Sequence, residues 1–214
     1  MKAMKYILAS ALCMLVSTAC SGNKKSETNL NEPDSKAAQS EAINKAGKAL
    51  VVFFSHAGDN YAVGNIKVGN TKIVADYISA FTGADQFEIK TNKYDGMAYT
   101  PLTELAKEEQ QNGELPPFDG ELKDLDKYTT VFIGGPVWWG TYPQVMFTFF
   151  SKYDLNGKTI IPFTTHEGSG LGSCVKDVKK AYPKANVTGE FSIYGHDVRE
   201  GKDKVEKWLK KIGF

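Results

Sequence analysis

The stretch TVFIGGPVWWG (Thr130–Gly140) shows most directly how this chain of 214 residues folds. Thr130–Ile133 carries no charge and is rich in β-branched and aromatic residues, which is typical of a strand buried on both faces. Gly134, Gly135 and Pro136 then favour the end of that strand. The loop that follows holds two adjacent tryptophans that no regular apolar face requires. We expect one of them to fold over the core and the other to contact a flat ligand or a partner.

The same pattern of short apolar run and amphipathic segment recurs along the chain. The other predicted strands are Ala49–Phe54, Asp85–Ile89, Thr159–Thr164 and Val187–Ile193. The predicted helices are Thr71–Phe81, Val145–Phe150, a segment from Leu171 to Tyr182, and a closing segment from Val205 to Ile212. Continuous apolar strands alternating with helices predict an α/β fold with a doubly wound, five-stranded parallel sheet in the order 2-1-3-4-5. In such a sheet a ligand binds beyond the carboxyl ends of the strands.

The N-terminal region differs in composition from this domain. Met1–Lys5 contains two lysines, Tyr6–Val16 is apolar, and small residues precede Cys20, which together are typical of a secretory signal. The small residues before the cysteine resemble a bacterial lipobox, although Ser17 stands where that pattern prefers Leu. The resemblance implies a signal peptide at residues 1–19, lipidation of Cys20 and attachment to a membrane of the bacterial cell envelope, facing the periplasm or the surface. Ordinary secretion is the alternative.

The segment between that cysteine and the first strand predicts a flexible tether. Residues 21–47 contain no aromatic residue and are rich in Ser, Asn, Lys and Glu, so they bury too little apolar surface to order themselves. We therefore expect three parts: the signal (1–19), the lipidated Cys20 with its tether (20–47), and one globular domain (48–214).

Charge and cysteine content exclude several classes of protein. The net charge is +1, becoming −1 once Lys2 and Lys5 leave with the signal, and Arg199 is the only arginine. A near-neutral chain with so few guanidinium groups is a poor nucleic-acid binder. Cys174 is the one cysteine of the domain, so no disulfide can form within it, and we expect Cys174 to be a small buried apolar residue.

Three loops at predicted strand ends carry candidate ligand contacts. The first suits an anion, because glycines and small hydroxyls at a helix N-terminus offer neutral donors. The second offers aromatic rings, and the third offers glycines that permit close backbone approach. In order, the candidates are Ser55, His56, Gly69, Asn70 and Thr71; Pro136, Val137, Trp138, Trp139 and Gly140; and Thr165, His166, Glu167, Gly168 and Gly170.

Together these loops resemble the FMN site of the flavodoxin family, in a subfamily with a Trp-Trp loop and a long phosphate loop. The resemblance implies that Ser55, Asn70 and Thr71 hold the FMN phosphate and that the other two loops flank the isoalloxazine ring. About ten extra residues separate Ser55-His56 from Gly69-Asn70-Thr71. They include a tandem repeat, Val63–Lys67 followed by Val68–Lys72, and only the second copy contains a threonine and runs into a predicted helix.

The resemblance implies an exported electron-transfer protein that binds FMN. Its partner would be a redox protein or a membrane-associated electron donor, since soluble nicotinamide donors are normally cytoplasmic. Two alternatives stay open: an FMN-dependent reductase of quinones or other small molecules, and a binding lipoprotein of the same fold without flavin. The sequence contains no zinc-protease motif, no paired metal-ligand histidines and no serine-hydrolase elbow, so we assign neither a metal nor a catalytic residue.

Overall fold

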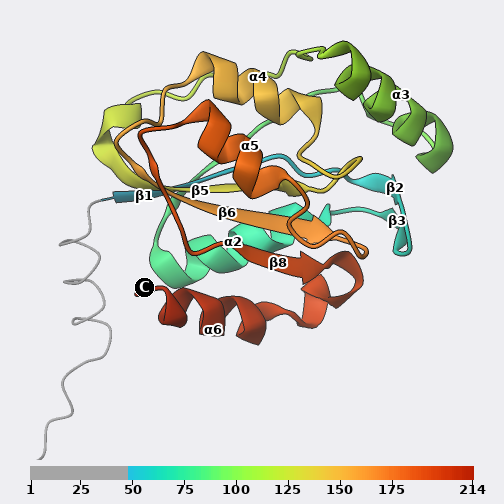
Figure 1. The fold of residues 1–214 in the computed structure, drawn as a ribbon. Helices are drawn as coiled ribbons and strands as arrows, with labels where there is room; N and C mark the ends of the chain where they lie inside the picture. The colour runs from blue at the N-terminus through green and yellow to red at the C-terminus, as the bar shows by residue number, and fades with distance from the viewer. Residues whose placement is uncertain (1–47) are drawn as a thin grey trace, which may run out of the picture. The chain divides into compact units, whose positions relative to one another are not determined.

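The computed structural model describes residues 48–214, so the predicted signal, Cys20 and the tether lie outside the described residues. A parallel sheet forms the centre of the domain (Figure 1), and its strands run in the spatial order β4-β1-β5-β6, with β7 and β8 both paired to β6. This arrangement confirms the predicted order 2-1-3-4-5. The strands are β1 (Lys48–Phe53), β4 (Asp85–Glu88), β5 (Tyr128–Pro136), β6 (Thr159–His166), β7 (Asn186–Val187) and β8 (Phe191–Tyr194).

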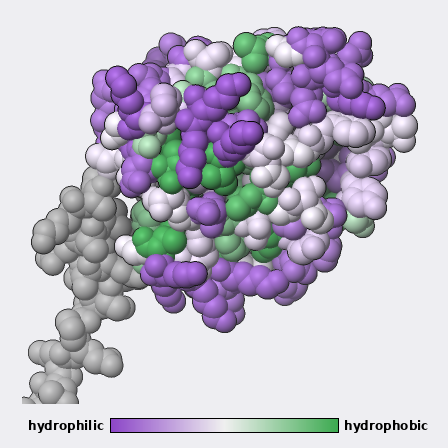
Figure 2. Space-filling model, viewed as in Figure 1, coloured by the Kyte–Doolittle hydropathy of each residue, from purple (hydrophilic) through white to green (hydrophobic). Residues whose placement is uncertain are grey.

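Helices cover both faces of the sheet. In the view of Figure 1, α3, α4 and α5 lie above it, and α2 and α6 lie below it. The helices are α2 (Asn70–Thr82), α3 (Tyr99–Asn112), α4 (Gln144–Lys152), α5 (Cys174–Ala181) and α6 (Lys202–Lys211), with short 3-10 turns η1 (Leu125–Lys127) and η2 (Gly195–Glu200). The outer surfaces of α3 and α6 are hydrophilic (Figure 2). Among the described residues, no helix has the length and hydropathy needed to cross a membrane.

Strand β1 shows why the sheet needs helices on both sides. Successive side chains of a strand point to opposite faces. Leu50 and Val52 therefore enter the core under α3, α4 and α5, while Val51 and Phe53 enter the core over α2 and α6. All four are essentially inaccessible to water, so the continuous apolar run is explained by two cores rather than one.

The only cysteine of the described domain lies in the first of these cores. Cys174 begins α5 and is fully buried and free. Burial raises the pKa of its thiol to about 12, so it stays protonated and unreactive at neutral pH. This confirms the prediction that Cys174 acts as a small apolar residue.

Two features differ from the sequence prediction. The fifth strand is not continuous over Val187–Ile193 but is split into β7 and β8, because Gly189 takes a positive φ of 68° between them and its carbonyl accepts the indole N–H of Trp208. The predicted helix beginning at Leu171 starts only at Cys174, since Leu171 lies in a turn.

Three further elements were not predicted. Helix α3 is largely polar, and only three of its residues are buried. Strands β2 (Gly58–Asn60) and β3 (Gly64–Ile66) form a small antiparallel hairpin inside the ten-residue insertion. The hairpin and α3 both lie beside the carboxyl end of the sheet (Figure 1), so they bear directly on the site.

A glycine at the centre of the sheet sets the packing where the strands end. Gly134 of β5 is in register with Phe53 of β1 on one side and Phe163 of β6 on the other. A Cβ atom at Gly134 would lie 2.0 Å from Cζ of Phe163. The phenyl ring of Phe163 therefore occupies the space that any other residue at this position would fill.

We predict that Gly134→Ala lowers the free energy of unfolding by about 1–3 kcal/mol, because the added methyl group forces the buried ring of Phe163 out of place. Urea unfolding followed by circular dichroism measures this loss. Combining it with Phe163→Leu should cost less than the sum of the two single substitutions, since leucine vacates the same space. Strictly additive costs would show that the two positions do not compete for it.

Candidate functional site

A cavity of about 440 Å³ lies at the carboxyl end of the sheet. Its walls come from the loops after β5, β6 and β8, from the start of α2, from one side of α3 and from the β2–β3 hairpin. Strand β1 begins at Lys48 at the opposite edge (Figure 1). Clefts of this volume are typical of small-molecule and cofactor sites, and the place is the one that a doubly wound sheet predicts.

The start of α2 provides an anion-binding corner. Gly69 precedes the helix, and no side chain of its own caps it. Ser55, at the end of β1, accepts the backbone N–H of Lys72 on its Oγ at 2.9 Å, which leaves its hydroxyl proton free to donate. The positive end of a 13-residue helix and its first N–H groups favour a negative group here.

Close packing of glycine holds this corner together. A Cβ atom at Gly69 would lie 2.3 Å from Oγ of Ser55 and 2.6 Å from the carbonyl oxygen of His56, so the loop after β1 and the start of α2 touch. Next to it, the hydroxyl oxygens of Thr71 and Thr165 are 2.8 Å apart and buried. That hydrogen bond joins the first predicted loop to the third.

The two tryptophans lie in a tight turn that points them in different directions. Trp139 and Gly140 both have positive φ, 49° and 83°, and Trp138 and Thr141 exchange backbone hydrogen bonds around them. This is the geometry of a type I′ turn, in which asparagine and glycine are the usual residues and a tryptophan is strained. The strain places an aromatic residue at the rim of the cavity.

Trp138 packs inward and Trp139 stays at the surface. The indole of Trp138 makes edge contacts with Phe54, Tyr94 and His56, with ring centroids 5.2–5.8 Å apart. Trp139 is 51% exposed and lies along α3, where its indole N–H donates to the carbonyl of Thr103 at 2.7 Å. Both tryptophans line the cavity. Only Trp138 also packs against the core under α3, α4 and α5, which confirms the prediction that one tryptophan folds over the core.

The loop after β6 is held by its own hydrogen bonds. The hydroxyl of Thr164 donates to the carbonyl of Gly170, and the N–H of Gly168 donates to Nδ1 of His166 at 2.9 Å. Desolvation lowers the pKa of His166, and so does the nearby His196, although Glu167 opposes the shift. His166 is therefore a neutral acceptor at pH 7, and its ring packs on Tyr194.

A carboxylate–imidazole pair links this loop to η2. Glu167 accepts the backbone N–H of His196 at 2.9 Å, and its other oxygen lies 2.6 Å from Nδ1 of the same residue. The side chain of His196 is 54% exposed and that of Glu167 only 14%.

Gly195 packs against the side chains of Glu167 and Asn70. The amide oxygen of Asn70 accepts a hydrogen bond from Arg199 at 3.4 Å. The single arginine of the chain is thus next to the anion-binding corner.

The structure brings the predicted site residues to one end of the domain but not all to the cavity wall. Those that line it are Asn70, Val137, Trp138, Trp139, Gly140, Thr165, His166 and Glu167. Ser55, Gly69, Thr71, Pro136, Gly168 and Gly170 lie on the same loops without lining it.

His56 lies behind Trp138 rather than in the cavity. It is 6% exposed, and its Nε2 atom has no hydrogen-bond partner among the described residues. Desolvation lowers its pKa, so the ring is neutral at pH 7. The structure therefore assigns His56 to the support of the Trp138 ring.

Several lining residues were missed by the sequence analysis. Those from the hairpin and α3 are Asp59, Asn60, Tyr61, Tyr99, Leu102, Thr103 and Ala106, and two more, Ser169 and Gly195, come from loops. The inserted segment, with its aspartate, asparagine and tyrosine before the repeat, was the one sequence signal that could have indicated the hairpin. No local sequence pattern identifies Tyr99 and its neighbours on α3 as lining residues.

Comparisons with known proteins agree with this architecture. A sequence profile described as Flavodoxin matches residues 48–212. A protein from Bacteroides eggerthii described as a flavoprotein is 26% identical, with a TM-score of 0.57 over 78% of this chain and 99% of that one. A second, from Bacteroides uniformis, is 25% identical, with a TM-score of 0.58 over 77% and 99%.

A flavoprotein from Lactobacillus acidophilus, solved in complex with FMN, shares the fold at 20% identity, with a TM-score of 0.55 over 77% of this chain and 99% of that one. A search of curated proteins gave no match. Since the profile spans nearly all of the described domain, the chain belongs to the flavodoxin family.

Proposed function

We propose that the protein binds FMN in the cavity at the carboxyl end of the sheet. The observation that carries the proposal is the meeting of three unlike surfaces at one cavity: a helix start with neutral donors, an aromatic turn and a glycine-containing loop. The Lactobacillus acidophilus flavoprotein of the same fold was solved with FMN. A phosphate, a flat ring system and its polar edge require such a combination.

The residues present fit this cofactor. The first N–H groups of α2, the hydroxyl of Ser55 and the amide of Asn70 would hold the phosphate, and Gly69 keeps that corner free of side-chain atoms. Trp138 and Trp139 would flank the ring and exclude water from it. Bound FMN would supply reversible transfer of one or two electrons, and the chain would orient it and tune its potential.

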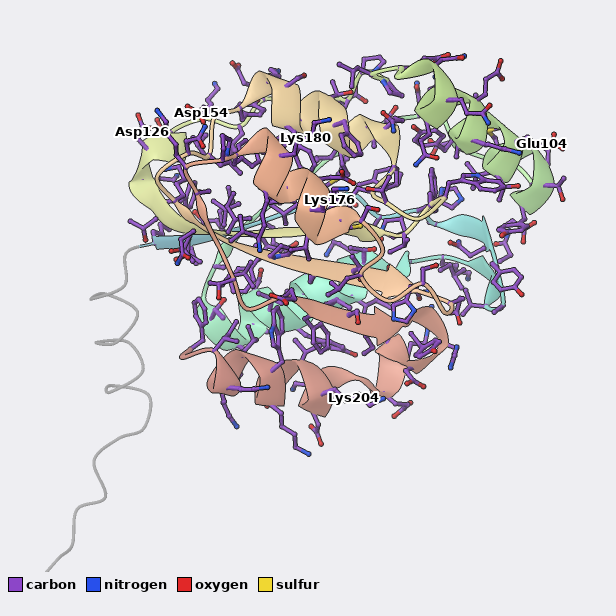
Figure 3. All side chains as sticks on the ribbon, viewed as in Figure 1. Glu104, Asp126, Asp154, Lys176, Lys180 and Lys204 are labelled. Atoms are coloured by element: carbon purple, nitrogen blue, oxygen red, sulfur yellow. The ribbon has the colours of Figure 1, made fainter. Side chains whose placement is uncertain are left out.

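We further propose that the protein transfers electrons at a membrane. Predicted lipidation at Cys20 supports the anchor, and the lack of a metal-ligand cluster or hydrolase motif in the sequence favours chemistry borne by the cofactor. The charged side chains are spread over solvent faces, with Glu104 on α3, Lys176 and Lys180 on α5, and Lys204 on α6 (Figure 3). This mixture of signs offers little long-range steering toward a strongly charged protein partner.

We predict that the purified full-length protein is yellow and releases FMN on denaturation in about a 1:1 ratio. Absorbance spectra and chromatography of the released cofactor measure this. Colourless protein that takes up no added FMN would contradict the proposal. A redox titration of the same sample distinguishes a one-electron carrier, with two well-separated potentials, from a reductase with a single two-electron step.

The tandem repeat supplies a matched pair of substitutions. Asn70 of the second copy lines the cavity, whereas the corresponding Asn65 of the first copy is exposed on the hairpin and does not. We predict that Asn70→Ala weakens FMN binding about tenfold, the loss of about 1.4 kcal/mol expected for a hydrogen bond to a charged group, while Asn65→Ala leaves it unchanged. Fluorescence titration of the apoprotein measures both affinities, and equal effects would rule out the assignment of the phosphate to the second copy.

Anchoring is tested separately. We predict that the protein incorporates a labelled fatty acid when expressed in a bacterium with lipoprotein-processing enzymes, and that Cys20→Ser abolishes the label and moves the protein from the membrane to the soluble fraction. The variant Cys13→Ser is the control, because Cys13 is expected to leave with the signal. Labelling that survives Cys20→Ser would refute lipidation at this residue.

A further inference from the structure

The inserted hairpin is the part of the cavity wall that the proposed function leaves unexplained. It is fixed in place at both ends: Ile66 of β3 is buried, and the carboxylate of Asp59 accepts the backbone N–H of Tyr99 at 2.9 Å. The second contact ties the hairpin to the first turn of α3, 40 residues away in sequence. The hairpin and α3 therefore form one continuous side of the cavity mouth.

The tip of the hairpin is ordered in a way that presents one tyrosine. The amide of Asn60 donates to the carbonyl of Gly58 at 3.1 Å, and the N–H of Val63 donates to the carbonyl of Tyr61 at 2.8 Å. Between them Ala62 has a φ of 63°, which is strained for a residue with a Cβ atom. This tight turn leaves the side chain of Tyr61 62% exposed.

Tyr61 and Tyr99 form an aromatic pair at the mouth. Their ring centroids are 5.7 Å apart, the planes are inclined by only 31°, and both side chains line the cavity. Trp139 lines the same mouth and is 51% exposed. Three partly exposed aromatic side chains at one opening are not required by either core, and flat rings of this kind bind other flat rings.

The charged side chains of the wall bear on which molecules can bind beside the hairpin, at the mouth of the cavity. The lining side chains include the carboxylates of Asp59 and Glu167 but, among the described residues, neither a lysine nor an arginine. An anionic molecule approaching the hairpin would meet the carboxylate of Asp59, which accepts the backbone N–H of Tyr99 but forms no ion pair among the described residues. A planar molecule without charge would meet aromatic rings and the hydroxyls of two tyrosines as hydrogen-bond donors.

We propose that Tyr61 and Tyr99 form a clamp for a planar, uncharged conjugated carbonyl compound, of which a quinone is the simplest class. Its carbonyl oxygens would accept hydrogen bonds at the mouth while its ring stacks on the tyrosine pair. The stacking and the hydrogen bonds that bind this compound come from side chains of this chain alone. The role of the bound compound as the small-molecule redox partner rests on the proposed function.

The test uses two probes of nearly equal size. The neutral probe is 2,3-dimethyl-1,4-naphthoquinone, whose blocked ring carbons cannot react with thiols. The charged probe is 2-hydroxy-3-methyl-1,4-naphthoquinone, which is an anion at pH 7. Binding to the full-length protein, with and without FMN, is measured by quenching of tryptophan fluorescence and by NMR shifts. We expect the neutral probe to bind at least tenfold more tightly than the charged probe. The Asp59→Asn variant should reduce this difference in affinity, since asparagine keeps the hydrogen bond to Tyr99 and removes the charge.

Substitutions distinguish binding at the clamp from non-specific binding to exposed apolar side chains. Tyr61→Ala and Tyr99→Ala should each weaken binding of the neutral probe by about tenfold, and Tyr61→Phe should retain most of it because the ring remains. Leu115→Ala is the control, since Leu115 is 50% exposed and does not line the cavity. Unchanged binding in both alanine variants, or an equal loss in Leu115→Ala, would overturn the clamp.

Measuring FMN affinity in the same variants keeps the two proposals distinct. We expect Tyr61→Ala to change FMN affinity by less than threefold. A loss of FMN affinity as large as the loss of probe affinity would make the tyrosines cofactor contacts and overturn the clamp. A protein that binds the neutral probe through Tyr61 and Tyr99 but takes up no FMN would support the clamp and refute the proposed function.

Discussion

The constraint on which the rest of the structure depends is that β1 and β5 are buried on both faces. A strand segment with water on neither side carries few polar side chains, so its chemistry is displaced to the loop where the strand ends. Parallel strands all end at the same edge, which is why Trp138, Thr165 and Glu167 line one cavity with Asn70, although Asn70 lies far from them in sequence. Gly134 shows how tightly this edge is packed, because the ring of Phe163 fills the position of its missing side chain.

The sequence predicted the parts of the fold that depend on local apolar pattern. The continuous runs of β1, β5 and β6 identified the strands, and the loops that follow them identified three walls of the cavity. Elements without such a pattern were missed: β2 and β3 have three residues each and include Gly, Asn and Asp, and α3 buries only a narrow strip. The interruption of the last strand depends on Gly189 accepting a hydrogen bond from Trp208, a tertiary contact that no local pattern indicates.

The candidate site shows the same difference between residues that a local sequence pattern identifies and residues that only tertiary contacts bring into place. Residues placed by a strand end or a helix start, such as Thr165 and Asn70, were identified from sequence, whereas Tyr99 lines the cavity only because α3 and the hairpin meet. The position of His56 shows the reverse case, in which a residue beside a strand end lies outside the cavity wall. This histidine directly follows Ser55 at a strand end, yet its ring turns into the aromatic cluster around Trp138 and away from the cavity. Adjacent residues at a strand end can face opposite sides, and packing of the neighbouring loop decides which side each takes.

The position of Lys48 has a practical consequence for handling this protein. Strand β1 enters the sheet at the edge opposite the cavity, and its six residues alone span roughly 20 Å at the usual rise per residue. An electrode, bead or fusion partner joined directly at Lys48 would therefore lie at the end of the domain opposite the mouth between the hairpin and α3, and would leave that mouth open.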